Sequence, residues 1–108
     1  MSYSIELTDN FKKEAKRLVK KYPSLKSELD HLFKELSATP TLGISLGNNI
    51  YKIRIAIASK GRGKSGGGRV MSFVKVVDNV VLLFSIYDKS EKDSISDNEI
   101  KALIEKEL

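Results

Sequence analysis

The segment from Ala58 to Arg69, with the sequence ASKGRGKSGGGR, combines basic side chains with five glycines in a pattern that suits phosphate binding. Its first eight residues fit a relaxed P-loop pattern, except that Ala58 stands where the first glycine belongs. Glycine allows the backbone to approach a phosphate closely, and the intervening Lys60, Arg62 and Lys64 supply positive charge. The segment therefore suits either the phosphates of a nucleotide or the backbone of a longer polyanion.

The surroundings of this segment argue against a nucleotide site. A P-loop requires a strand before it and a helix after it, because the helix N-terminus helps to bind the phosphates. The residues that follow the loop, RVMSFVKVV, alternate in a way that favours a strand. We also expect no separate acidic residue at the end of an apolar strand to hold Mg²⁺. We interpret the segment as a flexible basic hairpin that becomes ordered on an anionic polymer, and a hairpin whose charges only maintain solubility is the alternative.

The distribution of charge along the chain points to a polyanionic partner. The 108 residues carry a formal net charge of +5, and no Asp or Glu occurs between Glu35 and Asp78. Because a solvated surface normally mixes charges of both signs, we interpret this region as a surface that faces phosphates. Nucleic acid is the favoured partner, and an acidic protein is the alternative. The basic residues of the region are Lys52, Arg54, Lys60, Arg62, Lys64, Arg69 and Lys75.

Composition narrows the class of protein. The length suits one domain, which we expect to span residues 1–108. The absence of cysteine excludes disulfides and thiolate metal sites, and it is compatible with the cytoplasm, where we expect the protein to act. The N-terminal residues lack the pattern of a secretory signal, and the longest purely apolar run, Val80 to Phe84, is too short to cross a bilayer.

The first third of the chain predicts a short strand and two helices. Residues Tyr3–Leu7 alternate as in a strand, and Thr8 or Asp9 then provides a helix cap. Pro23 ends the first helix, and Ser24 starts the second. Their apolar stripes share one spacing, which predicts an antiparallel helix hairpin with facing stripes. The stripes are Phe11, Ala15, Leu18, Val19 and Tyr22 in the first helix and Leu25, Leu29, Leu32, Phe33 and Leu36 in the second.

The remainder of the chain predicts three strands and a last helix. After a loop over Ser37–Gly43, the residues from Asn49 alternate with a period of two. The segments Arg69–Val77 and Val80–Tyr87 follow as strands of an antiparallel meander, with apolar residues on both faces. The sequence SDNE near the C-terminus fits a capping box at the start of a helix. The order β-α-α-β-β-β-α is that of a small α+β domain.

The residues from Ile50 onward resemble the RelE/ParE toxin superfamily, and most closely its HigB-like members, which carry a Gly/Lys-rich hairpin. The resemblance rests on K-x-R at Lys52 to Arg54, on GKSGG-x-R ending at Arg69, and on I-Y-x-K-x-E starting at Ile86. Before Ile50 it rests on the helix hairpin and the first strand. The resemblance implies a small RelE-like domain, in which the helix hairpin packs on an antiparallel sheet and a C-terminal helix follows.

The same resemblance implies the toxin of a bacterial type II toxin–antitoxin system, with a cognate antitoxin protein as its partner. Most such toxins are endoribonucleases that cut mRNA in the ribosomal A site, so the ribosome and mRNA are further expected partners. They use no metal and no cofactor, and no membrane is involved. The RNA 2′-hydroxyl attacks the adjacent phosphate and leaves a 2′,3′-cyclic phosphate or a 3′-phosphate.

Cleavage of this kind requires a base, an acid and positive charge at the phosphate. Histidine would be the usual proton carrier, but the only one, His31, is expected on the surface of the second helix. The chemistry then falls to lysine, arginine and tyrosine. Arginine binds phosphate oxygens in a bidentate way, and a lysine within a cluster of cations loses its proton more readily.

The resemblance implies an active site built from the basic region and the end of the last strand. Arginines bear the transition-state charge, lysines contact the RNA backbone or carry protons, and a tyrosine and a lysine complete the site. The members are Arg54, Arg69, Lys60, Lys64, Tyr87 and Lys89, with further RNA contacts from Lys52, Arg62 and Lys75. Plainer interpretations are ribosomal RNA contacts for Lys60 and Lys64, a core-edge aromatic for Tyr87 and a solvated turn residue for Lys89.

One departure and two alternatives accompany this interpretation. Met71 and Ser72 follow Arg69 where related toxins often carry an aromatic residue, which leaves base stacking there without a candidate. ParE-like members of the superfamily poison DNA gyrase without cutting RNA, and they are expected to lack the basic cluster. A non-catalytic RNA- or ribosome-binding module would bind without cleaving.

Overall fold

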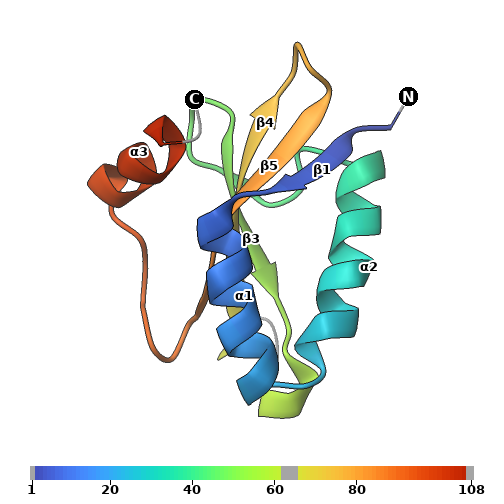
Figure 1. The fold of residues 1–108 in the computed structure, drawn as a ribbon, viewed down its shortest axis with the longest axis vertical. Helices are drawn as coiled ribbons and strands as arrows, with labels where there is room; N and C mark the ends of the chain where they lie inside the picture. Colours follow the sequence, from blue (N-terminus) through green and yellow to red (C-terminus); the bar gives the residue numbers. More distant parts are fainter. Residues whose placement is uncertain (1, 62–65, 107–108) are drawn as a thin grey trace.

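The computed structural model describes residues 2–61 and 66–106, which form three helices around a five-stranded mixed sheet (Figure 1). The strands lie in the order β1-β5-β4-β3-β2. The predicted α+β order is confirmed, with β2 as an additional two-residue strand and η1 as a short 3₁₀ helix. The elements are β1 (Ser4–Leu7), α1 (Asp9–Lys21), α2 (Leu25–Ala38), β2 (Ile44–Ser45), β3 (Ile50–Ile55), η1 (Ala58–Lys60), β4 (Gly68–Lys75), β5 (Val80–Asp88) and α3 (Asp97–Glu105).

The helix boundaries follow from local capping chemistry. The Oγ1 atom of Thr8 accepts a hydrogen bond from the backbone N–H of Phe11 at 3.0 Å, which confirms the predicted cap of α1. In α3, Ser96 and Glu99 form both hydrogen bonds of the predicted capping box, at 3.2 and 3.4 Å. Each such cap satisfies backbone N–H groups that would otherwise lack a partner at the first turn.

Ser24 is the N-cap residue of α2, as predicted, but its side chain makes no cap hydrogen bond. Its Oγ atom instead accepts a hydrogen bond from the backbone N–H of Ser59 at 2.9 Å. In return, the backbone N–H of Ser24 donates to the Ser59 hydroxyl at 2.9 Å. The carboxylate of Glu28 accepts from the backbone N–H of Ala58 at 2.8 Å. The first turn of α2 therefore holds η1 in place.

The sheet has apolar clusters on both faces, as the alternation of its strands predicts. Helices α1 and α2 cover one face and α3 covers the other (Figure 1). On the α1–α2 side the buried strand residues are Ile53, Ile55, Val70, Val81, Leu83 and Ile86, packed against Phe11, Leu18, Leu25, Leu29, Leu32 and Leu36. On the α3 side they are Met71, Phe84 and Tyr87, packed against Ile95, Ile100 and Ile104.

Strand β1 pairs in parallel with β5, from Ser4 opposite Val80 to Leu7 opposite Leu83, so the sheet is mixed. The other neighbouring strands are antiparallel, as predicted for the meander. Beyond the end of β1, a polar side chain of α1 bonds to the free edge of β5. The Asn10 amide donates to the carbonyl oxygen of Phe84 at 2.9 Å. Within the described residues, no helix is long and apolar enough to cross a membrane.

Candidate functional site

Three residues predicted for the active site form a row across the sheet. Arg54 of β3 lies opposite Arg69 of β4, and Arg69 lies opposite Tyr87 of β5. Side chains directly opposite one another on neighbouring strands point to the same face, with their Cβ atoms about 5 Å apart. We refer to Arg54, Arg69 and Tyr87 as the cross-strand row. The neighbours of these residues along the strands face α1 and α2, so the row lies on the opposite face.

The cross-strand row has an exposed end and a buried end. Arg54 is exposed on β3, where β2 pairs only with Tyr51 and Lys52. Arg69 and Tyr87 are each 4% exposed. One guanidinium nitrogen of Arg69 donates to the carbonyl oxygen of Gly68 at 3.0 Å, which fixes the direction of the side chain. An anion that approaches from the β3 edge therefore meets Arg54 first.

The hydroxyl group of Tyr87 is buried, and Tyr87 belongs to the apolar cluster under α3 together with Ile95 and Ile100. Among the described residues it has no hydrogen-bond partner. Burial raises the pKa of Tyr87, and the positive charge of Arg69 opposes that shift without cancelling it. The Tyr87 hydroxyl therefore stays protonated at neutral pH and can donate a hydrogen bond.

Two further basic residues predicted for the site lie near the row. Lys52 stands two positions before Arg54 on the same face of β3 and is half-buried. Lys89 follows β5, and its ammonium group pairs with the carboxylate of Asp93 and donates to the Asp93 carbonyl oxygen at 3.0 Å. Lys89 is therefore engaged within the chain rather than free in a turn.

Asp93 is a residue of this region that the sequence analysis missed. The hydrogen bond from Lys89 lowers the pKa of Asp93, and the charges of Lys52 and Arg69 add to that effect. The Asp93 carboxylate therefore lies close enough to Lys52 and Arg69 to be stabilised by their positive charges. The four-residue spacing of Lys89 and Asp93 is the sequence signal that could have indicated the pair.

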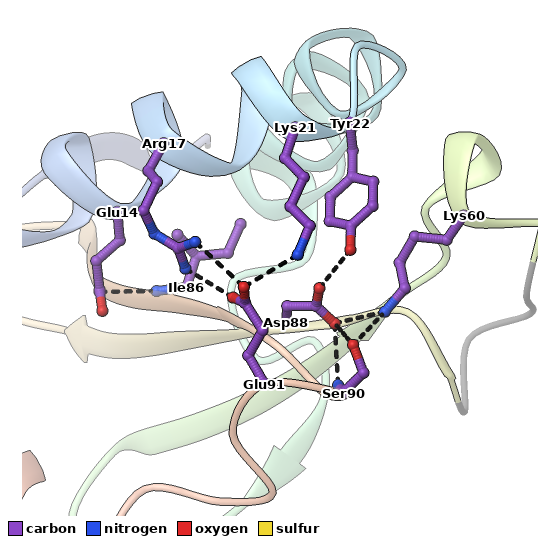
Figure 2. A network of polar contacts seen from close by, with 9 residues as sticks. All are labelled: Glu14, Arg17, Lys21, Tyr22, Lys60, Ile86, Asp88, Ser90 and Glu91. Carbon is purple, nitrogen blue, oxygen red and sulfur yellow. Dashed lines mark hydrogen bonds and ion pairs between the residues drawn. The ribbon is translucent and has the colours of Figure 1, made fainter.

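Lys60, predicted as a catalytic or RNA-contacting residue, is buried in an ion pair (Figure 2). Its ammonium group contacts the carboxylate of Asp88, and these side chains are 6% and 0% exposed. It also donates to the Ser90 hydroxyl at 3.2 Å and lies 5.5 Å from the centre of the Tyr22 ring. Lys60 therefore serves the internal packing of η1, and in this conformation RNA does not reach it.

Asp88 is the centre of this polar network (Figure 2). Besides Lys60, it accepts hydrogen bonds from the Tyr22 hydroxyl at 2.6 Å and from the backbone N–H and hydroxyl of Ser90 at 2.9 and 2.7 Å. Burial alone would raise the pKa of Asp88, but the bonds from Lys60, Tyr22 and Ser90 together hold it well below its ordinary value. The carboxylate joins α1, η1 and the end of β5.

Asp88 also corrects one expectation. The sequence analysis found no acidic residue at the end of an apolar strand, yet Asp88 is the last residue of β5. Its oxygens are occupied by protein donors, so it does not complete a P-loop site. The strand β4, which begins at Gly68 near the end of the Ala58–Arg69 segment, stands where a P-loop would require a helix.

The remaining predicted residues lie apart from the row or outside the described part. Lys75 lies at the far end of β4, six residues and about 20 Å from Arg69, and its nearest acid is Asp78 at 3.8 Å. Arg62 and Lys64 fall outside the described residues. His31 lies on the surface of α2, as expected, with Glu35 at 3.4 Å.

The family model of the RelE toxin, from the RelE/RelB toxin–antitoxin system, matches residues 7–106. The chain belongs to the RelE toxin family. This confirms the resemblance seen in the sequence, although the closer likeness to HigB-like members stays a prediction. Membership of the family makes the chain a toxin of a toxin–antitoxin system and implies an antitoxin as its partner.

Solved structures of RelE share the fold. A double arginine-to-alanine mutant of the Escherichia coli toxin RelE in its free state matches with a TM-score of 0.66 and 17% identity, over 100% of both chains. A crystal structure of the isolated E. coli RelE toxin matches with a TM-score of 0.61 and 18% identity, over 98% of this chain and 99% of that one. At this level of identity the likeness concerns the architecture, which agrees with the RelE-like fold expected above.

Proposed function

We propose that this RelE-family toxin is a ribosome-dependent endoribonuclease that cleaves translated mRNA without a metal ion. The observation that carries the proposal is the cross-strand row, in which Arg54 and Arg69 occupy opposed positions and Tyr87 follows on the next strand. Guanidinium groups bind phosphate oxygens through paired N–H donors. A phosphodiester at the exposed end of the row would contact Arg54, and the buried Arg69 lies directly behind it on β4.

In the proposed reaction the ribose 2′-oxygen attacks the adjacent phosphorus, and the bond from phosphorus to the 5′-oxygen breaks. The products are a 2′,3′-cyclic phosphate and a free 5′-hydroxyl. Arg54 and Arg69 stabilise the negative charge that develops on the phosphorane. The protonated hydroxyl of Tyr87 is our candidate donor to the leaving 5′-oxygen, and this role requires the side chains that cover it under α3 to move aside.

Lysines supply the remaining functions in this proposal. Lys52 stands beside Arg54 and suits the RNA backbone or the removal of the 2′-hydroxyl proton. Lys89 is assigned to the same region and is held by Asp93 in the free protein. Arg62 and Lys64 keep their proposed RNA contacts. Lys60 is reassigned to a supporting role, because Asp88 occupies its ammonium group.

The test adds purified protein to a reconstituted translation reaction and maps mRNA 5′ ends by primer extension. We expect new ends at in-frame positions only when ribosomes translate the message. The variant Arg54→Ala should reduce cleavage by about a hundredfold, since removing one preformed charge contact at a transition state typically has this effect. Lys75→Ala is the control, because it removes a cation about 20 Å from Arg69 along β4, and this proposal gives its predicted RNA contact no part in cleavage.

Three results would contradict the proposal. Intact mRNA under active translation would exclude the nuclease, and inhibition of gyrase supercoiling by the same preparation would then favour the ParE-like alternative. Binding to ribosomes without cleavage would favour the non-catalytic module. Equal losses in Arg54→Ala and Lys75→Ala would separate the activity from the cross-strand row.

A further inference from the structure

The connection between β5 and α3 is fixed to the rest of the fold on both sides of Asp93. Before Asp93, the carboxylate of Glu91 accepts hydrogen bonds from Arg17 and Lys21 of α1 at 2.7 and 3.1 Å (Figure 2). After Asp93, the side chain of Ile95 is buried in the cluster under α3. The Asp93 side chain can therefore change its direction without a movement of the whole connection.

Lys89, the first residue of this connection, lies on the same face of the sheet as the cross-strand row. Its backbone N–H donates to the carbonyl oxygen of Gly67 at 3.0 Å, which continues the pairing of β4 with β5 one step beyond Asp88. Because side chains alternate along an extended strand, Lys89 points to the same face as Tyr87, two residues before it. The ammonium group of Lys89 therefore adds to the positive charge along the row.

An acidic side chain of the same connection occupies this ammonium group in the free protein. The ammonium group of Lys89 pairs with the carboxylate of Asp93 and also donates to the Asp93 carbonyl oxygen at 3.0 Å. The side chain of Lys89 is 30% exposed, whereas that of Asp93 is 92% exposed. The carboxylate can therefore turn away from Lys89 into water, while the carbonyl oxygen, which belongs to the backbone, stays in place.

The Asp93 carboxylate is stabilised by cations that we assign to RNA. The hydrogen bond from Lys89 lowers the pKa of Asp93 most, and the charges of Lys52 and Arg69 lower it further. The influence extends to Tyr87, whose pKa is raised by burial and, in addition, by the negative charge of Asp93. A carboxylate and a phosphodiester are both oxygen anions that accept hydrogen bonds from the same donors. An RNA phosphate that binds along the row therefore competes with Asp93 for these cations.

We propose that Asp93 occupies a phosphate-binding position at Lys89 in the free toxin and leaves it when RNA binds. The ammonium group of Lys89 exchanges the carboxylate for a phosphate oxygen, while its bond to the Asp93 carbonyl oxygen keeps it in place. Exposed ion pairs stabilise a protein little, so the exchange costs little. The charge of Asp93 stays near the bound phosphate and repels it, so this residue limits the affinity of the face for RNA.

The inference rests on the proposed function in one respect, which is that RNA is the polyanion bound along the row. It does not require cleavage, so its test measures binding alone. A gain of RNA affinity in a variant of Asp93, with no cleavage in the translation reaction, would exclude the nuclease and keep this inference. Cleavage in the translation reaction without such a gain would do the reverse.

The test uses the full chain and a short fluorescein-labelled single-stranded RNA with 2′-O-methyl riboses, in which the attacking hydroxyl groups are blocked. Fluorescence anisotropy at one fixed salt concentration measures the affinity. Asp93→Asn removes the charge but keeps the size of the side chain and the backbone carbonyl, and we expect it to bind this RNA about threefold more tightly. Asp30→Asn is the matched control, because it removes one exposed carboxylate beside the groove between α1 and α2, and it should change the affinity by less than about 1.5-fold.

A double-mutant cycle tests whether the gain depends on Lys89. In the Lys89→Ala background the ammonium group is absent, so Asp93→Asn should raise the RNA affinity by less than about 1.5-fold. Carbon-13 NMR follows the exchange directly. Addition of RNA should move the resonance of the Asp93 carboxyl carbon and leave that of Glu91 in place, because Arg17 and Lys21 continue to bind Glu91. Thermal unfolding shows that each variant is folded before the affinities are compared.

Several outcomes would overturn the proposal. These are no gain of affinity in Asp93→Asn, a gain equal to that of Asp30→Asn, the same gain with and without the Lys89 ammonium group, or an Asp93 carboxyl resonance that RNA does not move. Polyglutamate of the same charge as the RNA is run as a further probe. If it binds the wild type as tightly as the RNA does, the face takes the carboxylates of a protein, and the proposal is wrong.

Discussion

Lys60 and Asp88 lie 28 residues apart in sequence and form an ion pair in which neither side chain has appreciable contact with solvent. The pair joins η1, at the start of the Ala58–Arg69 segment, to the last residue of β5. Asp88 lies opposite Gly68, next to the facing pair of Arg69 and Tyr87. The ion pair therefore anchors the end of the sheet that carries the cross-strand row.

Removing the carboxylate should destabilise the fold. We expect Asp88→Asn to lower the free energy of unfolding by about 3 kcal/mol, because the charge of Lys60 stays buried without its partner. Urea denaturation measures the change. Asp78→Asn is the control, since that carboxylate is 61% exposed and 3.8 Å from Lys75, and it should cost less than about 0.5 kcal/mol. Similar losses of unfolding free energy in both variants would show that the buried pair stabilises the fold no more than the exposed pair does.

The same pair predicts a dependence of stability on pH. The pKa of Asp88 is lower in the folded protein than its ordinary value of about 4 in the unfolded chain. Its stabilising contribution is therefore complete above about pH 5 and decreases as the pH falls below about 4. Urea denaturation from pH 3 to pH 7 should show a steeper acid loss for the wild type than for Asp88→Asn. Parallel curves would refute this assignment.

Tyr87→Phe separates packing from chemistry. The hydroxyl has no partner among the described residues, so its removal should change the free energy of unfolding by less than about 1 kcal/mol. Cleavage of mRNA should decrease by about a hundredfold if the hydroxyl donates a proton. Tyr51→Phe, on β3 but outside the row, should leave both quantities unchanged. A fully active Tyr87→Phe protein would reduce Tyr87 to a core aromatic.

Gly67 permits the close approach of β4 to β3, and alanine should not fit there. A Cβ atom on Gly67 would lie 2.1 Å from the carbonyl oxygen of Ile55. We expect Gly67→Ala to cost about 2 to 3 kcal/mol, because the backbone must move. Gly61→Ala meets no atom within 4 Å and costs only the left-handed conformation at φ +70°, about 1 kcal/mol. Thermal unfolding compares the two, and the reverse order would contradict the steric argument.

The features predicted correctly from the sequence depend on neighbouring residues. Thr8 and the Ser96–Glu99 box cap helices through bonds that span three residues, so the sequence contains the whole signal. The alternation of β3 separates Ile53 and Ile55, which pack on the α1–α2 side, from Arg54 on the other face. Strand β2 was missed because two exposed residues, Ile44 and Ser45, show no periodicity. The parallel pairing of β1 with β5 joins distant segments and leaves no local pattern.

In the candidate site, too, the features that depend on distant residues were the ones that the sequence did not predict. The family resemblance grouped Arg54 and Arg69 in one site, and the pairing of β3 with β4 brings them opposite each other. The burial of Lys60 in an ion pair could not be predicted, because its partner Asp88 lies far along the chain. A run of basic residues is equally compatible with a solvated loop. An acidic residue directly after the apolar run VVLLFSIY was the available signal, and it was overlooked.

The parallel pairing of β1 with β5 affects how the protein folds during its own synthesis. β1 emerges from the ribosome first, yet its partner residues Val80 to Leu83 are added only in the last third of the chain. β4 also needs β5 as its neighbour. Because the pairing of β1 with β5 joins the two ends of the sheet sequence, the entropic cost of closing this pair is met only when β5 has been added. A nascent chain that stops before Val80 lacks β5, the strand that pairs with both β1 and β4 and carries Tyr87, so an incomplete copy of this toxin carries no assembled site.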